Sequence, residues 1–388
     1  MKKEMLLLNI SLVNNKYKGV KTMKPLELAK KIWDYAKTIG VPEGKDPRHT
    51  SSPLHHYPGI LSMFAGIQAA AASGDKEWID EVNSYLAKYP HRFNDPDVFF
   101  SCAFDNYRVG SLGKGWAVMK GLFDEDKELI REYAELTLAA PRSDDGIICH
   151  PTIPDKRIWV DVVFAVTPFM LYAGIILNEE KYIDYAVEQC FKMYDVFMDK
   201  SNGLLHQTRG FLEDKSKTSD DHWSRGNGWG ILGMTELVRY LPKDSKYYAE
   251  AVERFKAHCE ALIKYQNFRG LWRQEIPESL SWEESSGTGI FLYAFGVGMR
   301  RGILDRETYM PVLEKGIEGI CKYCINSDLS IEKCCCGCCC PGVGDMKGTV
   351  EAYLTIPMPK HNDSHVFGPV IMALTEAENN GIKNVEFN

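Results

Sequence analysis

The acidic residue best suited to proton transfer is Asp161, which stands inside the apolar segment RIWVDVVFAVTPFML. Aromatic and aliphatic neighbours would exclude water from its carboxyl group, which disfavours the charged form and raises the pKa. A carboxylic acid with a raised pKa can donate a proton near neutral pH, as general acid catalysis requires. The alternative is an acid at the start of a helix, stabilised there by capping or by the helix dipole.

A second group of chemically able residues follows between positions 206 and 229, where GLLHQTRG precedes DDHWSRGNGW. Aromatic rings interleaved with carboxylates, arginine and histidine are typical of a carbohydrate site, because sugars offer CH faces for stacking and hydroxyls for hydrogen bonds. The alternative for the tryptophans is that they only fill one end of the fold. In this segment we expect substrate contacts from His206, Arg209, Trp223, Arg225, Asn227 and Trp229.

Further candidates lie in other polar, aromatic-rich stretches of the chain. Asp105 and Tyr107 stand together in FDNYR, His56 precedes an apolar run, and His365 lies in a polar segment near the end. We expect Tyr107, His56 and His365 to complete the substrate site. Asp105 is either an active-site carboxylate or a turn-forming residue before the next helix.

The chain has 12 cysteines, of which the run CCCGCCC occupies positions 334–340. The others are scattered through a chain long enough to form a core without disulfides, so we expect reduced thiols. Adjacent cysteines do not pair comfortably with each other, although they could gather a soft metal. The spacing fits no standard zinc pattern, and the sequence therefore favours an ordinary reduced loop with no metal.

Composition excludes several classes of function. The chain of 388 residues is 45% hydrophobic and 26% charged, as in an ordinary globular protein. A net charge of -7 argues against a broad nucleic-acid interface, which would need a basic face. No apolar run approaches the ~20 residues of a membrane span. The interrupted apolar stretch after Met1 is a poor signal peptide, so we expect a cytoplasmic protein without nucleic-acid or membrane partners.

Apolar positions at three- and four-residue spacing predict helices almost throughout and no long strand. Very short connections, such as Gly74-Asp75 and Pro242-Lys243, alternate with long loops rich in Pro, Gly, aromatic and polar residues. The predicted helices span 25–39, 55–73, 76–88, 111–123, 125–139, 160–178, 180–199, 226–241, 244–266, 284–302, 305–322 and 363–381.

This alternation predicts the arrangement of the helices. Because short turns make antiparallel hairpins, all long loops must lie at one end. The even-numbered helices are more apolar and should form an inner ring, with the charged odd-numbered ones outside. We therefore expect an all-α fold, an (α/α)6 barrel in a single domain over residues 25–388 after an N-terminal extension of residues 1–24. A helical solenoid would give a similar periodicity, but the sequence shows no strict repeat.

The motifs WVDVVFAVTPFML, GLLHQTRG, WSRGNGW and EESSGTGIFLYAFGVGMRRGIL, followed by a final helix after a His-containing loop, resemble a known family. They are similar to the unsaturated glucuronyl and rhamnogalacturonyl hydrolases, glycoside hydrolase families 88 and 105, with closer resemblance to the latter. The resemblance runs from about Asp105 to the end, and it implies an (α/α)6 barrel.

The resemblance also implies a reaction. Enzymes of this kind remove a 4,5-unsaturated uronic acid from the non-reducing end of lyase-generated oligosaccharides by hydrating the C4–C5 double bond. Carried onto this chain, Asp161 would protonate C4 and then help water attack C5, with Asp105 as its partner. Arg225 or Arg209 would offset the substrate carboxylate, and the site would be lined by His206, Trp223, Arg225 and Trp229. Hydration needs no redox cofactor or metal, so none is expected.

Two other readings keep the fold. The chain could be a conventional glycosidase, or a sugar epimerase or lyase, because fold does not decide function. It could also be a non-catalytic carbohydrate-binding protein, although the presence of Asp161 counts against that. The motifs do not separate rhamnogalacturonan fragments from other unsaturated oligosaccharides, and they say nothing of oligomeric state.

Overall fold

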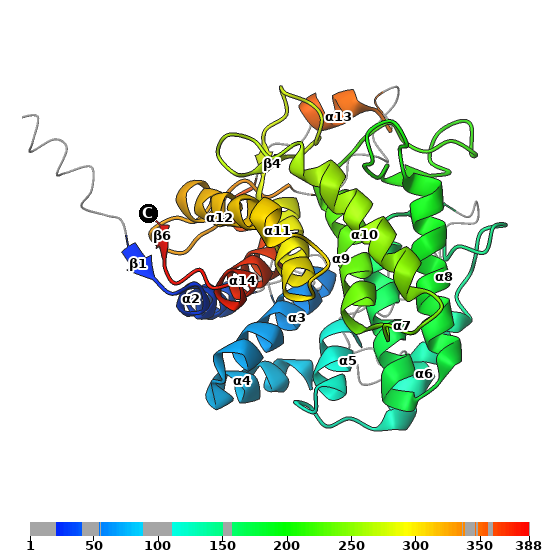
Figure 1. Cartoon of the computed structure of the whole chain (residues 1–388), viewed down its shortest axis with the longest axis horizontal. Coiled ribbons are helices and arrows are strands. Elements are labelled where there is room, and N and C mark those ends of the chain that lie inside the picture. Colours follow the sequence, from blue (N-terminus) through cyan, green and yellow to red (C-terminus); the bar gives the residue numbers. More distant parts are fainter. Residues whose placement is uncertain are drawn as a thin grey trace, which may run out of the picture.

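The computed structural model describes residues 21–40, 54, 56–87, 111–149, 157–335, 337, 346, 348–355 and 360–387, without the side chains of residues 56, 57 and 111. Helices account for most of these residues (Figure 1). The expectation of an all-α fold is therefore confirmed.

The described helices form two concentric layers. Each inner helix packs against the next, and α14 packs back against α3, so the ring is closed and the solenoid alternative is excluded. The inner helices are α3 (His56–Ser73), α5 (Ser111–Met119), α7 (Val162–Leu177), α9 (Ser224–Tyr240), α11 (Ser285–Arg300) and α14 (Ser364–Asn379). The outer helices are α2 (Pro25–Thr38), α4 (Lys76–Leu86), α6 (Lys127–Leu138), α8 (Glu180–Phe197), α10 (Tyr248–Ile263) and α12 (Arg306–Tyr323).

The inner position of the even-numbered predicted helices follows from their composition. Helices α9 and α11 are buried on nearly every face, whereas α4 and α10 bury one stripe and expose the other. Gly287 lets α11 approach the start of α9 closely, since a Cβ atom there would collide with the side chain and backbone of Ser224. This glycine therefore allows two inner helices to pack closely at the end of the barrel where the candidate site lies.

Three of the short turns end in an aspartate that caps the N-terminus of the following outer helix. Asp75, Asp126 and Asp305 each accept a hydrogen bond from a backbone N–H in the first turn of α4, α6 and α12, at 3.1, 2.9 and 2.8 Å. These bonds satisfy donors that the helix itself leaves free. All such turns lie at one end of the barrel, which leaves the opposite end to the long loops.

Short two-stranded antiparallel ribbons join segments that lie outside the helices. Strand β2 (Ile158–Trp159) pairs with β3 (Thr208–Arg209), and β4 (Trp272–Arg273) pairs with β5 (Glu283–Glu284). Strand β1 (Lys21–Met23) pairs with β6 (Val385–Phe387), so the residues just before α2 meet the C-terminal segment. A short helix, α13 (Val350–Thr355), lies in the last long loop and was not predicted, because six residues carry too little periodicity.

Among the described helices, none combines the length and the apolar character that a membrane crossing requires. Six described cysteines hold free thiols, as the sequence predicted: Cys190, Cys259, Cys321, Cys324, Cys334 and Cys335.

Candidate active site

Asp161 stands at the junction of β2 and α7, at the loop end of the barrel. The ribbon fixes this junction, because the backbone N–H of Val160 donates to the carbonyl of Gln207 at 2.9 Å. Asp161 occupies the N-cap position of α7, yet its side chain makes no capping hydrogen bond. The residue is 7% exposed. The position is thus the one that the capping alternative predicted, but the side chain remains available for chemistry.

The pKa of Asp161 is raised to about 7, chiefly by burial and to a smaller extent by the negative charge of Asp221. The charge of Arg225 and the nearby amide of Gln207 act in the opposite direction. Neither Asp161 Oδ2 nor Gln207 Nε2 reaches hydrogen-bond distance of a partner among the described residues. A carboxyl group in this state can exist as a neutral acid near pH 7 and can still take up a proton after giving one away.

Asp221 is a second buried carboxyl group that sequence reasoning did not single out. It is fully buried, and burial together with the charge of Glu275 raises its pKa to about 7. Its Oδ2 accepts from the backbone N–H of Trp223 at 3.3 Å, while Oδ1 has no partner among the described residues. Asp221 belongs to the segment DDHWSRGNGW, which the sequence analysis singled out. However, nothing in the sequence indicated which of its two aspartates would lie close enough to Asp161 to affect its pKa.

Arg225 supplies the positive charge beside Asp161. It lies in the first turn of α9, with its guanidinium over the ring of Trp223 at 4.7 Å. Nη1 donates to the carbonyl of Cys335 at 2.8 Å and to Ser286 Oγ at 3.2 Å. Because these contacts fix the guanidinium plane, Arg225 is a rigid cation suited to a carboxylate ligand.

Cys334 and Cys335, the first two residues of the cysteine run, contact this site, which the expectation of an ordinary reduced loop did not include. Trp223 Nε1 donates to Cys335 Sγ at 3.2 Å, and Cys334 Sγ lies 3.8 Å from Asp363 Oδ1. Both thiols are fully buried, and burial raises their pKa values, so they are neutral packing groups here. Sequence spacing could not reveal this, because the contact joins residues more than a hundred positions apart.

Gln207 and Tyr353 close the side of the site next to Trp223. Tyr353 Oη donates to Gln207 Oε1 at 2.5 Å, and the Tyr353 ring stacks on Trp223 with centroids 6.3 Å apart. Tyr353 comes from α13, the helix that sequence periodicity missed. The adjacent His206 does not face Asp161 in the same way, since its ring packs against His222.

His365 lies close to Arg225 and Asp363. It lies at the start of α14, where Nδ1 is 2.6 Å from Asp363 Oδ1. Burial and the charge of Arg225 lower the pKa of His365. The pKa of Asp363 is also lowered: burial opposes this, while His365 and Arg225 outweigh it. Helices α7, α9 and α14 therefore converge on one charged cluster around Arg225.

Other predicted residues take supporting positions. Asn227 is fully buried, and its amide bonds to both backbone groups of Leu205, at 2.7 and 3.0 Å, and to His258 at 3.1 Å. Trp229 stacks on Phe164 with centroids 4.0 Å apart, one turn after Asp161 in α7. Both residues make these contacts inside the protein, and their predicted contact with substrate stays a prediction.

Arg209 is directed elsewhere. Its Nη2 lies 2.8 Å from Asp145 Oδ2, at a partly exposed surface, and its charge is not among those that shift the pKa of Asp161. Of the two arginines considered for the substrate carboxylate, the structure places Arg225 beside the candidate acid. Asp105 and Tyr107 lie outside the described residues, as does the side chain of His56.

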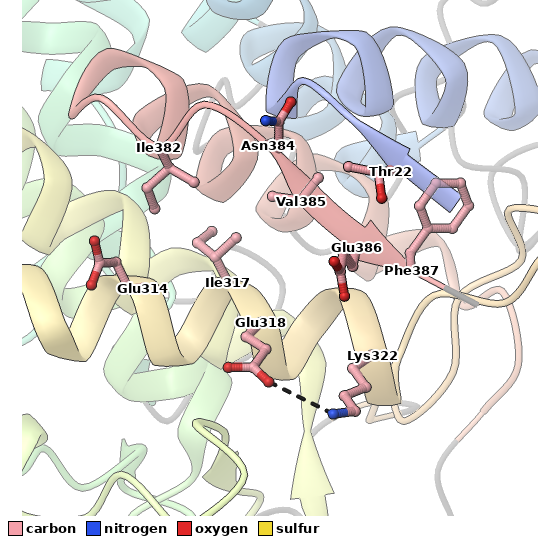
Figure 2. A pocket seen from close by; sticks show the side chains of 10 residues that line it. All are labelled: Thr22, Glu314, Ile317, Glu318, Lys322, Ile382, Asn384, Val385, Glu386 and Phe387. Carbon is pink, nitrogen blue, oxygen red and sulfur yellow. Dashed lines mark ion pairs between the residues drawn. The ribbon is translucent and has the colours of Figure 1, made fainter. Parts of the chain in front are cut away.

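A groove of about 870 Å³ lies in a different part of the molecule, between α12 and the β1–β6 ribbon. Figure 2 shows Thr22 and the segment from Ile382 to Phe387 on one side and residues of α12, among them Glu318 and Lys322, on the other. It contains none of the groups around Asp161.

Known proteins resemble the chain in sequence and in fold. It is 30% identical over 166 residues to an unsaturated 3S-rhamnoglycuronyl hydrolase of Formosa agariphila, which is 40% of this chain and 44% of that protein. It is 26% identical over 249 residues to the unsaturated rhamnogalacturonyl hydrolase YesR of Bacillus subtilis, 60% of this chain and 68% of the relative. The match thus spans less than half the length of the first relative.

Solved structures share the barrel. A family 105 glycoside hydrolase of C. acetobutylicum has a TM-score of 0.71 at 20% identity, covering 91% of this chain and 99% of that one. A possible member of the same family from Salmonella enterica has a TM-score of 0.72 at 19% identity, covering 91% and 93%. The sequence profile of Glycosyl Hydrolase Family 88 matches residues 42–380, which is most of the chain. The protein therefore belongs to Glycosyl Hydrolase Family 88.

Proposed function

We propose that this protein removes a 4,5-unsaturated uronic acid from the non-reducing end of oligosaccharides by hydrating the C4–C5 double bond. The observation that carries the proposal is the buried carboxyl of Asp161, whose pKa is raised to about 7 beside the fixed cation of Arg225. Protonation of an alkene carbon needs a neutral acid, and binding of a uronate needs a local cation. Membership of Glycosyl Hydrolase Family 88 supports the same reaction.

In this mechanism Asp161 acts twice. It first transfers its proton to C4, which leaves positive charge shared between C5 and the ring oxygen. A water molecule then adds to C5, and its proton returns to the carboxylate of Asp161, so the acid is regenerated. The resulting hemiketal opens and releases the rest of the chain. Because no displacement occurs at the anomeric carbon, carboxylate spacing does not predict stereochemistry here.

Arg225 binds the substrate carboxylate in this proposal, while Trp223 and His365 border the sugar. Asp221 takes the part of the like charge that keeps the pKa of Asp161 high. Asp105, Tyr107 and His56 remain predicted members of the same site. The two named relatives act on unsaturated rhamnoglycuronyl and rhamnogalacturonyl compounds, so a uronyl residue linked to rhamnose is the first substrate class to try.

We further propose that residues 25–388 form the catalytic domain and that the reaction occurs in the cytoplasm. The free thiols of Cys334 and Cys335, next to the reactive groups, suit a reducing compartment.

The test is ultraviolet absorbance during incubation with lyase-generated unsaturated oligosaccharides, run beside their saturated counterparts. We expect the vinyl-ether signal to disappear with at least one member of the unsaturated set, and no cleavage of the saturated set. Cleavage of saturated substrates would instead identify a conventional glycosidase. A folded protein that changes neither set would contradict an enzymatic role on these sugars.

A further inference from the structure

A cluster of two histidines and one carboxylate lies beside the candidate active site, and the proposed proton transfers need none of the three. One ligand atom each from Asp199, His206 and His222 falls within 4.8 Å of the others. The two imidazole rings are 4.7 Å apart, and His222 Nε2 is 3.0 Å from Asp199 Oδ2. Two imidazoles and a carboxylate form a donor set that zinc and other first-row dications accept.

The other nitrogen of each histidine is directed by a neighbour. His222 Nδ1 lies 3.5 Å from Glu275 Oε1, on the side away from Asp199. His206 interacts with the backbone of Asp221, while its Nδ1 is buried without a partner among the described residues. Histidine ligands in metal sites usually have such an outer partner, which fixes the tautomer and turns the second nitrogen toward the ion.

His222 Nε2 has two polar neighbours in the cluster. The side-chain amide of Asn202 lies 3.1 Å from this nitrogen and the carboxylate of Asp199 lies 3.0 Å from it. The same amide donates to Asp199 Oδ2 at 3.0 Å, so His222 Nε2 can carry the proton that it shares with this carboxylate. A metal ion that takes the place of this proton would bind Nε2 and the carboxylate together.

We propose that Asp199, His206 and His222 bind one divalent first-row transition-metal ion, with Zn²⁺ as the representative. The metal replaces the proton between His222 and Asp199 and takes the unpartnered Nδ1 of His206. No metal was expected from the sequence, because hydration needs none. The three ligands also follow no standard metal-binding spacing: His206 and His222 come from two separate parts of a long loop, and Asp199 follows α8.

The site has a consequence for the candidate active site. Gln207 follows the ligand His206, and Asp221 precedes the ligand His222, so one ion would fix the two chain segments that carry neighbours of Asp161. In this role the metal is structural and takes no part in the reaction. The inference is independent of the proposed function, because it concerns binding of an ion and not turnover.

The experiment measures metal binding by the full-length, tag-free, chelator-stripped protein under reducing conditions. Calorimetric titration with Zn²⁺ should give one ion per chain. His222→Gln and Asp199→Asn should each weaken binding about 100-fold, since each removes or neutralises one of three ligands. His361→Gln is the matched control, because His361 is exposed and pairs with Glu332 outside the cluster, and its binding should stay within about twofold.

Substitution with Co²⁺ separates this site from the cysteine segment. Nitrogen and oxygen ligands give the visible bands of the ion without a strong sulfur charge-transfer band, and these bands should vanish in His222→Gln. Circular dichroism checks that each variant is folded, and Asp199→Asn decides the matter if His222→Gln does not fold. Absence of binding, wild-type affinity in both variants or a thiolate charge-transfer band would overturn the proposal.

Discussion

Carboxyl groups are buried inside the ring at both ends of the barrel, but their hydrogen bonding differs. At the turn end, Glu236 accepts hydrogen bonds from Tyr172 Oη at 2.6 Å and from Tyr293 Oη, and it pairs with Arg239 at 3.5 Å. Both of its oxygens therefore have partners. At the loop end, Asp161 Oδ2 and Asp221 Oδ1 have none among the described residues. Buried carboxyl groups are thus fully hydrogen-bonded at the turn end and only partly hydrogen-bonded at the loop end.

The difference separates a group that stabilises the fold from one held ready for reaction. A satisfied buried carboxylate contributes to stability and has no capacity left for a ligand. An unsatisfied one weakens the fold, and such groups gather at functional sites. Eleven residues of α9, about 17 Å at 1.5 Å per residue, separate Arg225 at the loop end from Glu236 at the turn end. The same inner helix thus serves both purposes.

Asp161→Asn is the sharpest test of the loop end. We expect kcat/KM to fall about 10³-fold, because the amide cannot donate the proton or recover it from water. The protein should remain folded, since asparagine has the same shape. The measurement is the rate of loss of vinyl-ether absorbance with purified variant and parent.

The matched control is Asp195→Asn, which removes a carboxylate from an exposed pair with Arg254 on the outer layer. Its activity should remain within about twofold of the parent. Near-normal turnover in Asp161→Asn would contradict the proposed mechanism and the contrast between the two ends.

Glu236→Gln tests the turn end. It leaves the half-buried Arg239 without the charge of the buried Glu236, and breaking such a pair costs about 3 kcal/mol in the free energy of unfolding. Activity of the folded fraction should stay within about twofold, because the change is far from Asp161. Denaturant unfolding measures the first effect and initial rates the second. A large loss of turnover without a loss of stability would show that the turn end also takes part in the reaction.

Much of the fold could be predicted from the sequence. Helix spacing and alternating loop length gave the ring and the end at which loops gather, because both depend on local signals that recur six times. The missed element, α13, has six residues, and the ribbons have two or three residues per strand. Elements this short are fixed by tertiary contacts, which leave no periodic pattern to read.

The candidate site was predictable in part. Asp161 could be found because its apolar neighbours stand beside it in the chain, and Arg225 because it belongs to a compact motif. Contacts between distant segments bring three further residues to the site: Asp221, Tyr353 and Cys335. Their residue types and neighbours in the sequence gave no indication of these contacts. The internal contacts of Asn227, which was predicted to contact substrate, were hidden for the same reason: its partners Leu205 and His258 are visible only once the chain is folded.

The stability of Asp161→Asn should depend on pH. The folded-state pKa of Asp161 is raised from 3.8 to about 7, so the folded protein holds this proton more tightly than the unfolded chain. That contribution is fully present below pH 4 and is lost as pH rises to 7. The variant should therefore be more stable than the parent by about 2 kcal/mol at pH 8, at roughly 1.4 kcal/mol per pKa unit and with allowance for the lost partner of Arg225.

Thermal unfolding at pH 4 and pH 8 measures this difference, and Asp195→Asn again serves as the control. The gap between Asp161→Asn and the parent should narrow toward pH 4. A gap of the same size at both pH values would mean that the carboxyl of Asp161 is not held neutral by its surroundings, and the two ends of the barrel would then differ less than their hydrogen bonds indicate.

The smallest expected effect comes from Arg225, where charge and shape can be separated. Arg225→Lys keeps the charge but loses the planar contact with Trp223 and the fixed bonds to Cys335 and Ser286. We expect KM to rise about tenfold with little change in the pH profile. Arg225→Gln removes the charge that lowers the pKa of Asp161, so the alkaline limb of kcat/KM, which should lie near pH 7 in the parent, should move to higher pH. If the alkaline limb of kcat/KM stays at the same pH in Arg225→Gln, the charge of Arg225 does not affect the pKa of Asp161. The role of Arg225 in the site would then be limited to packing.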